Sequence, residues 1–422
     1  MADQTSTIPK GSDFAKATPD TWKMTTLGEV VDIQSGFAFK SQDFESKKGF
    51  PVVKIKNIQP PIVKIERGDL VDISSYGEEK LAKFEVKNGE FLIAMTGETI
   101  GKVGKYNLGK FAYINQRVCK IIKTEKSDYG FVYYLLLQRS FQKYIDTHSF
   151  GAAQANISTD QIGNYKISLP EPLEQRAIAA VLSSLDDKIE LLREQNKTLE
   201  ATAQAIFKEW FVDFNFPGAT GKMIDSELGE IPEGWRVGML SEIANFLNGL
   251  ALQNYPPESS TEYLPVIKIK ELNSGISEQT DKASARLDKK YIVEDGDVLF
   301  SWSGSLIVDI WKYGKGALNQ HLFRVTSDEF PKWFYFYWIK EHLPSFQQTA
   351  TAKAVTMGHI QRHHLDDALI TIPDDNFLKV ADNIFTPLLK KMINSNSEIQ
   401  ALSALRDALL PKLMSGMIRV NV

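Results

Sequence analysis

Apolar residues recur in alternating steps of four and three along residues 178–210, which is the spacing of a heptad repeat. The positions are Ile178, Leu182, Leu185, Ile189, Leu192, Asn196, Leu199, Ala203, Ile206 and Trp210. Shifted by 203 residues, the same spacing falls on Ala381, Phe385, Leu388, Met392, Ser395, Ile399, Leu402, Arg406, Leu409 and Leu413. The spacing predicts two long helices, each with an apolar seam along one face.

The two apolar seams favour pairing with each other in an antiparallel arrangement, and the alternative is that each helix packs only on its own domain. In the antiparallel pair, Asn196 is expected level with Ser395, as a polar layer at the centre. Thr386–Pro387 is expected to break or restart the second helix, since threonine and proline are typical of a helix start. Pro411 is expected to kink its end.

Between the helical segments, short stretches of alternating character predict strands. "FPVVKIKNI" at 50–58 and "LPVIKIKEL" at 264–272 both alternate apolar with basic residues. Val53 and Ile55 would face a core, with Lys54 and Lys56 on the other face. This period of two predicts a half-buried strand in each segment.

The similarity between the two halves extends to further segments in the same order. The matched pairs are 20–41 with 233–254, 86–101 with 293–308, 113–121 with 317–325, and 156–170 with 359–373. Aromatic-rich helical stretches, 129–146 and 331–348, precede the last pair. We therefore predict an α+β protein with a duplicated α/β domain and pseudo-twofold symmetry. The expected parts are an N-terminal arm (1–20), domain 1 (21–170), a helical region (171–216), domain 2 (217–372) and a second helical region (373–422).

Composition narrows the function classes. The fractions of hydrophobic (43%) and charged (24%) residues are those of a soluble globular protein. The single cysteine, Cys119, and the polar N-terminus indicate a cytoplasmic protein, and no apolar run is long enough to cross a membrane. The net charge of −4 differs from the strongly basic balance of proteins that hold DNA by bulk electrostatics. Any DNA binding must therefore come from local patches, or be strengthened by a more basic partner.

Several long motifs resemble the specificity subunits of Type I restriction–modification systems. They are "LPEPLEQRAIAAVLSSLDDKIE", "IFKEWFVDFNFP", "MIDSELGEIPEGW" and the closing "LLPKLMSGMI". The resemblance extends from about residue 20 to the end. It is weaker in the second half, where "DDNFLKVA" replaces "PLEQRAI".

This resemblance implies two target recognition domains, each reading one part of a split double-stranded DNA sequence, and two helices that form an antiparallel coiled coil between them. It also implies two partner modification subunits, which bind S-adenosylmethionine and methylate adenine, and further restriction subunits. The specificity subunit itself would perform no chemistry and hold no cofactor.

The residues agree that this chain is not the catalyst. It has neither an Asn-Pro-Pro-Tyr nor an Asp-Pro-Pro-Tyr tetrapeptide, which would hold a flipped adenine. "GETIGKVG" at 97–104 is one residue short of a phosphate-binding loop and has Val103 where Ser or Thr should follow the lysine. "HIQRHH" at 359–364 offers histidines but no obvious further ligand, so no metal site is predicted.

Comparing the two copies separates scaffold from candidate DNA contacts. Shared residues such as Asn115–Gln116 and Asn319–Gln320 are expected to be structural, whereas residues that differ at matched positions are candidates for base contacts. Shared lysines are interpreted as phosphate contacts, with a solvated strand face as the alternative. The candidate DNA-binding residues are Lys54, Lys56, Arg117, Gln154, Asn156, Lys268, Lys270, His321, Lys353 and Arg362.

The composition alone leaves a second function open. A coiled-coil adaptor that carries two protein-binding domains, without nucleic acid, would also suit the duplication and the mildly acidic residues 217–372. A gel shift in the presence of the partner methyltransferase separates the two hypotheses.

Overall fold

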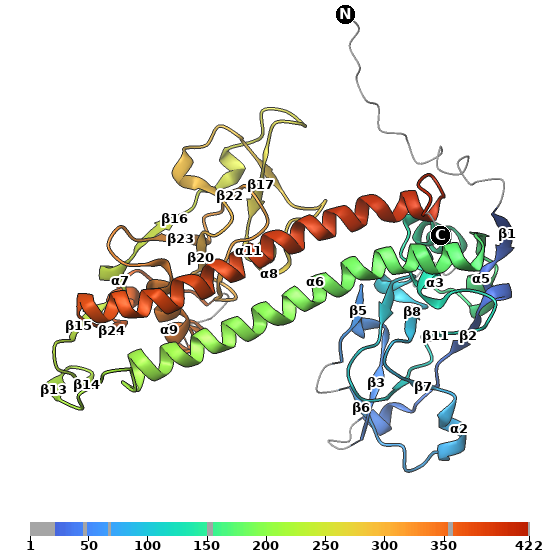
Figure 1. Ribbon diagram of the computed structural model, residues 1–422, viewed down its shortest axis with the longest axis horizontal. Helices are drawn as coiled ribbons and strands as arrows, with labels where there is room; N and C mark the ends of the chain where they lie inside the picture. The colour runs from blue at the N-terminus through green and yellow to red at the C-terminus, as the bar shows by residue number, and fades with distance from the viewer. Residues whose placement is uncertain (1–21, 45–48, 66–68, 150–154, 353–357, 421–422) are drawn as a thin grey trace, which may run out of the picture. The chain divides into compact units, whose positions relative to one another are not determined.

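A computed structural model describes residues 22–44, 49–65, 69–149, 155–352 and 358–420. The chain divides into two units. Unit 1 comprises Met1–Asp187 and Ser403–Val422, and unit 2 comprises Lys188–Leu402. Figure 1 follows the chain from the N-terminus to the C-terminus, and each unit is described by itself.

The described residues of unit 1 form three sheets with the orders β1-β12, β6-β3-β10-β7 and β2-β11-β8-β9-β5-β4. Its strands are β1 (Lys23–Thr26), β2 (Asp32–Ser35), β3 (Phe50–Val53), β4 (Ile58–Gln59), β5 (Ile62–Val63), β6 (Leu70–Val71), β7 (Glu85–Val86), β8 (Phe91–Ala94), β9 (Val103–Lys105), β10 (Ala112–Ile114), β11 (Val118–Ile122) and β12 (Lys166–Leu169). Its helices are α1 (Leu27–Val30), α2 (Glu78–Ala82), α3 (Tyr129–Leu136), α4 (Arg139–His148) and α5 (Thr159–Gly163), with the short turns η2 (Ser41–Phe44), η3 (Ile55–Asn57) and η4 (Gly97–Thr99).

The described part of unit 2 repeats this topology, without counterparts of β5 and β4, in the orders β15-β24, β18-β17-β22-β19 and β16-β23-β20-β21, and adds the hairpin β13-β14. Its strands are β13 (Met223–Ser226), β14 (Gly229–Pro232), β15 (Arg236–Met239), β16 (Asn245–Asn248), β17 (Leu264–Ile267), β18 (Lys282–Ala283), β19 (Ile292–Val293), β20 (Val298–Ser301), β21 (Val308–Ile310), β22 (Gly316–Leu318), β23 (Leu322–Thr326) and β24 (Leu369–Ile372). Its helices are α7 (Leu240–Ile243), α8 (Ile269–Ser274), α9 (Lys332–Ala352) and α10 (His363–Asp366), with the short turns η6 (Leu252–Asn254) and η7 (Lys289–Tyr291).

The duplication is therefore confirmed at the level of strand pairing. In unit 1, β3 pairs in parallel with β10, and in unit 2, β17 pairs in parallel with β22. A turn with a glycine at positive φ precedes the buried strands β8 and β20, at Gly89 and Gly296 respectively. That conformation costs little only for glycine, which explains the Asn-Gly and Asp-Gly pairs of the sequence.

Two details of the predicted elements are wrong. The strands expected over 50–58 and 264–272 end at Val53 and Ile267, and the chain turns into η3 and α8. The backbone N–H of Lys54 donates to the Asn57 side chain, and the N–H of Lys268 donates to Glu271. These hydrogen bonds stabilise the start of a helical turn, so the alternating pattern does not continue as a strand.

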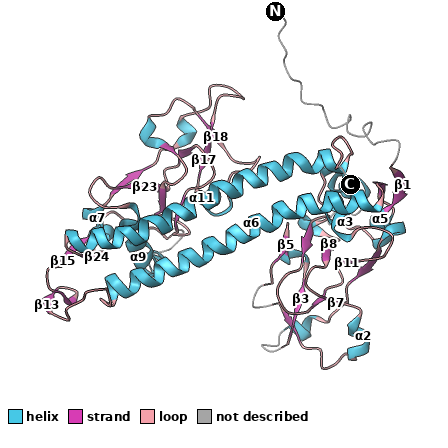
Figure 2. Ribbon diagram, viewed as in Figure 1, coloured by secondary structure: helices cyan, strands magenta, loops and turns pink. Residues whose placement is uncertain are grey.

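The two long helices are confirmed as α6 (Pro172–Phe207), continued by the π-helical turn η5 (Lys208–Val212), and α11 (Asp375–Met414). They have 36 and 40 residues and are the longest helices in Figure 2. The break expected at Thr386–Pro387 is wrong, because α11 begins at Asp375 and runs through both residues. Pro387 has no N–H to bond the backbone carbonyl of Asn383. Asn383 and Pro387 are both exposed, so water can bind that carbonyl.

The apolar seam packs in the antiparallel sense within unit 2. Ile189 and Leu192 of α6 form a cluster with Ile399 and Leu402 of α11. Asn196 lies further along α6, and its Nδ2 donates to the backbone oxygen of Met392 at 3.4 Å. Later residues of α6 thus contact earlier residues of α11, as an antiparallel pair requires. The central polar layer is confirmed, but the side-chain partner of Asn196 is Asn396 at 2.9 Å rather than Ser395 next to it.

Each unit has its own apolar core, which includes residues of both long helices. In unit 1, Ile178 and Leu182 of α6 and Leu413 of α11 pack with the aromatic helix α3. In unit 2, Phe207 and Phe385 pack with α9. The aromatic-rich segment 129–146 forms two helices, α3 and α4, whereas 331–348 lies within the single helix α9.

Candidate nucleic-acid interface

A tight turn follows the central parallel strand in both units. The Val118 N–H donates to the backbone oxygen of Asn115 at 2.8 Å, and the Leu322 N–H donates to the backbone oxygen of Asn319 at 3.0 Å. The two central residues of each turn are Gln116–Arg117 in unit 1 and Gln320–His321 in unit 2. Arg117 and His321 are exposed, so side chains at the tip of the turn can reach a ligand in solvent.

The shared glycines of the opening motif hold this turn in place. A Cβ on Gly36 would lie 2.3 Å from the Asn115 oxygen, and a Cβ on Gly249 would lie 2.3 Å from the Asn319 oxygen. No side chain tolerates such a contact, so both positions need glycine for the close approach of two backbones. The residue after each glycine accepts a hydrogen bond from the turn, from Gln116 N–H to the Phe37 oxygen and from Gln320 N–H to the Leu250 oxygen, both at 2.9 Å.

A second segment joins the turn from the end of β8 or β20. Met95 N–H donates to the Arg117 oxygen at 2.9 Å, and the Met95 oxygen accepts from Ile157 N–H at 3.0 Å. In unit 2, Trp302 N–H donates to the His321 oxygen at 3.4 Å, and the Trp302 oxygen accepts from Ile360 N–H at 2.9 Å. The same backbone hydrogen bonds therefore connect three segments in each unit.

We call this arrangement the three-segment junction. It comprises residues 95–97, 115–118 and 155–157 in unit 1, and 302–304, 319–322 and 358–360 in unit 2. It brings the predicted residues Arg117 and Asn156 into one place. In unit 2, Ser303 is next to both histidines, because it pairs with His359 in an isolated bridge and its hydroxyl contacts His321.

The backbone of the junction is the same in both units, but its side chains differ. The differing pairs are Met95 and Trp302, Thr96 and Ser303, Arg117 and His321, and Asn156 and His359. The sequence did not predict that four further residues belong to the junction: Met95, Thr96, Trp302 and Ser303. Each differs at a matched position just before Gly97 or Gly304, and that difference could have identified them.

In unit 2 the junction side chains contact one another. The Ser303 hydroxyl lies 2.9 Å from His321 Nδ1, and the Trp302 and His321 rings lie 5.7 Å apart. The Trp302 indole N–H donates to the Asn248 side chain at 2.9 Å, which fixes the indole plane. Ser303 is buried and the indole N–H is already bonded, so His321 is the exposed side chain of this group that can reach a base edge.

The shared lysines of unit 1 have partners within the protein. The Lys54 and Lys56 ammonium groups each lie 3.2 Å from the carboxylate of Asp69, which is 2% exposed. Burial alone would raise the pKa of Asp69, but hydrogen bonds from Asn57 and the two lysines outweigh it and lower the pKa. Lys54 also lies 4.0 Å from the ring centre of Phe44. Both lysines thus stabilise the folded unit, and their contact with phosphate stays a prediction.

The matching lysines of unit 2 are both more exposed than Lys54. Lys268 forms an ion pair with the exposed Asp281, whose pKa is lowered chiefly by that hydrogen bond. Lys270 is exposed on α8. Both can reach a phosphate more easily than Lys54.

The remaining predicted residues fall into two groups. Arg362 is exposed just before α10, donates to the Phe246 oxygen at 3.2 Å, and lies 5.9 Å from the Phe323 ring centre. Gln154 and Lys353 lie outside the described residues.

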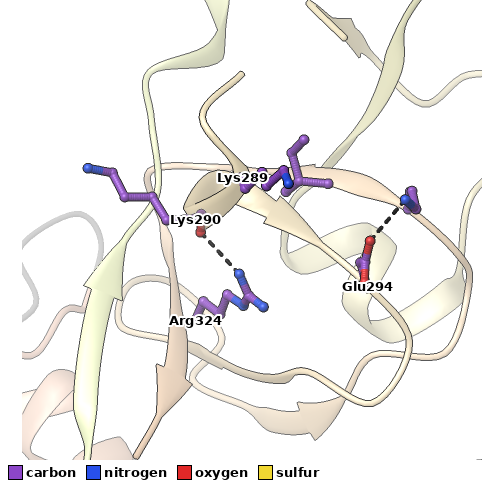
Figure 3. A pocket seen from close by; sticks show the side chains of 6 residues that line it. Lys289, Lys290, Glu294 and Arg324 are labelled. Carbon is purple, nitrogen blue, oxygen red and sulfur yellow. Dashed lines mark hydrogen bonds and ion pairs between the residues drawn. The ribbon is translucent and has the colours of Figure 1, made fainter. Parts of the chain in front are cut away.

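A basic depression of about 550 Å³ lies on unit 2 (Figure 3). It is lined by Lys289, Lys290, Ile292, Glu294, Lys315 and Arg324. Arg324 pairs with Asp297 at 3.1 Å, and Lys315 pairs with Glu294 at 3.0 Å. Lys290 also lies 3.7 Å from Asp288, so three of the four cationic side chains are paired with carboxylates and the depression has only a small excess of positive charge.

The glycine-rich motif at 97–104 begins with an ordinary turn. Gly97–Thr99 is the short turn η4, and the N–H groups of Gly101 and Lys102 donate to backbone oxygens of the protein. The described residues contain no group of three or more side chains able to bind a metal ion. Within the same residues, no helix is both long and apolar enough to span a membrane.

Comparisons with known proteins point to one family. A family model described as the Type I restriction modification DNA specificity domain matches residues 19–201 and 232–402. The chain is 28% identical over 420 residues to the Type I restriction enzyme MjaIX specificity subunit of Methanocaldococcus jannaschii, covering 91% of this chain and 97% of that protein. It is 22% identical to the EcoKI specificity subunit of Escherichia coli K12, covering 75% and 70%.

A solved structure has the same fold. It is the crystal structure of a Type I restriction–modification S subunit from M. genitalium, with a TM-score of 0.55 and 16% identity. The match covers 95% of this chain and 96% of that chain.

Proposed function

Because this chain belongs to the Type I restriction–modification DNA specificity family, we propose that it is the subunit that reads a bipartite DNA sequence for such a complex. Each unit reads one half-site, and the partner subunits carry out the chemistry of the complex. The proposal rests above all on the three-segment junction, because its backbone is the same in both units while its side chains differ.

That combination is what two readers of different sequences need. A common backbone presents side chains in a common orientation, and different side chains recognise different base edges. Arginine in the turn of unit 1 suits a guanine edge, which accepts two hydrogen bonds from a guanidinium group. His321 in the turn of unit 2 is hydrogen-bonded to Ser303 through Nδ1, and its Nε2 would exchange a 3.4 Å contact with Gln320 for a base or a phosphate.

We also propose the partners. Two modification subunits bind S-adenosylmethionine and methylate adenine, and restriction subunits complete the complex, while this chain supplies no catalytic residue. Its net charge of −4 supports a role for partners in DNA binding, because DNA affinity grows with the number of phosphates neutralised.

The test is to co-express the chain with its modification subunits and map methylated adenines genome-wide. The variant Arg117→Ala should relax or change recognition in one half-site, and His321→Ala in the other. Arg193→Ala is the matched control, because Arg193 is a half-exposed arginine on α6, remote in sequence from the junction. If neither junction variant changes the methylated sequence, or if each changes both half-sites, the assignment of one unit to one half-site is wrong.

A gel shift with the modification subunits present gives a second, independent result. A shift that requires the target sequence supports DNA reading. Complex formation without any DNA dependence would instead support an adaptor that binds only proteins.

A further inference from the structure

In the Asn-Gln pair that both units share, the asparagine is the more buried member: Asn115 is half-buried and Asn319 buried, whereas Gln116 is exposed and Gln320 half-buried. In unit 2, the Asn319 side chain accepts a hydrogen bond from His321 N–H at 3.2 Å and is 6% exposed. Both asparagines also close the turn through their backbone oxygens. The Asn319 side chain is therefore explained by the fold, as its position at the start of a turn suggests.

The glutamine is not explained by the fold. Gln116 and Gln320 both have φ below zero, so the backbone at these positions accepts most residues. Their N–H groups bond to Phe37 and Leu250, which any residue except proline could do. Among the described residues, the Gln116 side chain makes no hydrogen bond, and that of Gln320 contacts only the neighbouring His321, at 3.4 Å.

The presence of glutamine at this position of both turns therefore needs another explanation. Several side chains of the junction differ between the units, yet the glutamine in the turn, exposed in unit 1 and half-buried in unit 2, is the same. A carboxamide has an NH₂ group that can donate to N7 of adenine and a carbonyl oxygen that can accept from its N6 amino group in the major groove. No other base presents that donor–acceptor pair there.

We propose that Gln116 and Gln320 each bind an adenine edge at the same relative position of the two half-sites. This inference rests on the proposed function. It makes the two half-sites share one A·T pair at that position, next to base pairs that Arg117 and His321 distinguish.

The test uses the full complex with its modification subunits, and the variants Gln116→Ala and Gln320→Ala. Gln195→Ala, an exposed glutamine on α6, is the matched control. Methylome mapping should show one base pair relaxed in one half-site for each junction variant, and the lost preference should be A·T in both. The loss of discrimination should be roughly tenfold to a hundredfold at that position.

Competition binding supplies a second readout in case methylation is abolished. Duplexes with 7-deazaadenine at the assigned position lack the N7 acceptor. They should bind the wild-type complex roughly tenfold more weakly, and bind the Gln→Ala complex no worse than unmodified DNA does.

The outcomes separate the two proposals. If Arg117→Ala and His321→Ala change recognition but the glutamine variants do not, the glutamine proposal fails and the proposed function stands. Relaxation at positions with different bases in the two half-sites also overturns the shared adenine. If no junction variant changes recognition, the proposed function fails as well.

Discussion

Replacing Gly36 with alanine should loosen the turn that presents Gln116 and Arg117. The added Cβ would lie 2.3 Å from the Asn115 oxygen, 2.4 Å from the Ile114 oxygen and 2.6 Å from the Asn115 carbonyl carbon. All three atoms belong to backbone, so a side-chain rotation cannot relieve the contact. The strand β2 and the turn must move apart by about 1 Å for ordinary van der Waals contact.

The magnitude follows from two opposing effects. Forcing an extra carbon into a packed site costs about 1–3 kcal/mol. Replacing glycine in the unfolded chain returns about 0.4–1 kcal/mol, because alanine has less freedom to lose. We expect a net destabilisation of about 1–2 kcal/mol, or a fall in melting temperature of roughly 2–8 °C for a unit of this size.

Gly77→Ala is the matched control in the same unit. A Cβ at Gly77 meets nothing within 4 Å, and its φ is −71°, so alanine fits without strain. Its effect should stay within about 0.5 kcal/mol.

Hydrogen exchange followed by mass spectrometry gives the local result. The amides of residues 115–118 should exchange faster in Gly36→Ala, because the bonds from Gln116 to Phe37 and from Val118 to Asn115 weaken. The amides of 319–322 in unit 2 should not change. If Gly36→Ala is as stable as Gly77→Ala and its turn amides stay protected, the close approach is not the reason for glycine at this position.

Four further predictions follow from the same features. Exchanging residues 21–170 for the matching domain of a relative should change one half-site and leave the other, as methylome mapping would report. Inserting seven residues into both long helices, near Leu192 and Ser395, keeps the heptad phase and adds roughly 10 Å to each helix. Methylome mapping should then show that the unspecified spacer of the target is about three base pairs longer. The folded pKa of Asp69 is lowered, so its stabilisation is present above the ordinary value of 3.8 and is lost as the pH falls below it; Asp69→Asn should lower stability at pH 7 and flatten that acid dependence in a denaturation series. The isolated chain should bind DNA weakly, and nanomolar binding by the chain alone at physiological salt would contradict a role for partners. In the full complex, Lys289→Ala should reduce the slope of log affinity against log salt concentration by about one.

Local periodicity in the sequence was sufficient for the long helices and for the duplication. A helix buries every third or fourth residue, so an apolar seam is visible without knowledge of its partner. The repeated order of strands was visible for a related reason, because both copies must fill equivalent cores. The wrong details, the ends of β3 and β17 and the unbroken helix at Pro387, depend on single hydrogen bonds and on solvent exposure.

The candidate site was only partly predictable. Arg117 and His321 could be chosen because they differ beside a shared pair, but the sequence could not show that Met95 and Trp302 bond to the same turns. Segments some 20 to 60 residues apart meet at the junction only because strands pair across the sheets.

Charge was the least predictable property from sequence alone. Lys54 and Lys56 looked free to bind phosphate, since a sequence does not reveal that the buried Asp69 lies between them. A buried carboxylate must have cationic or hydrogen-bonding partners, and the fold decides which lysines supply them. The sequence thus determined which elements exist and that they occur twice. The tertiary structure decided which side chains remain available to a ligand, because long-range packing assigns the rest to the protein itself.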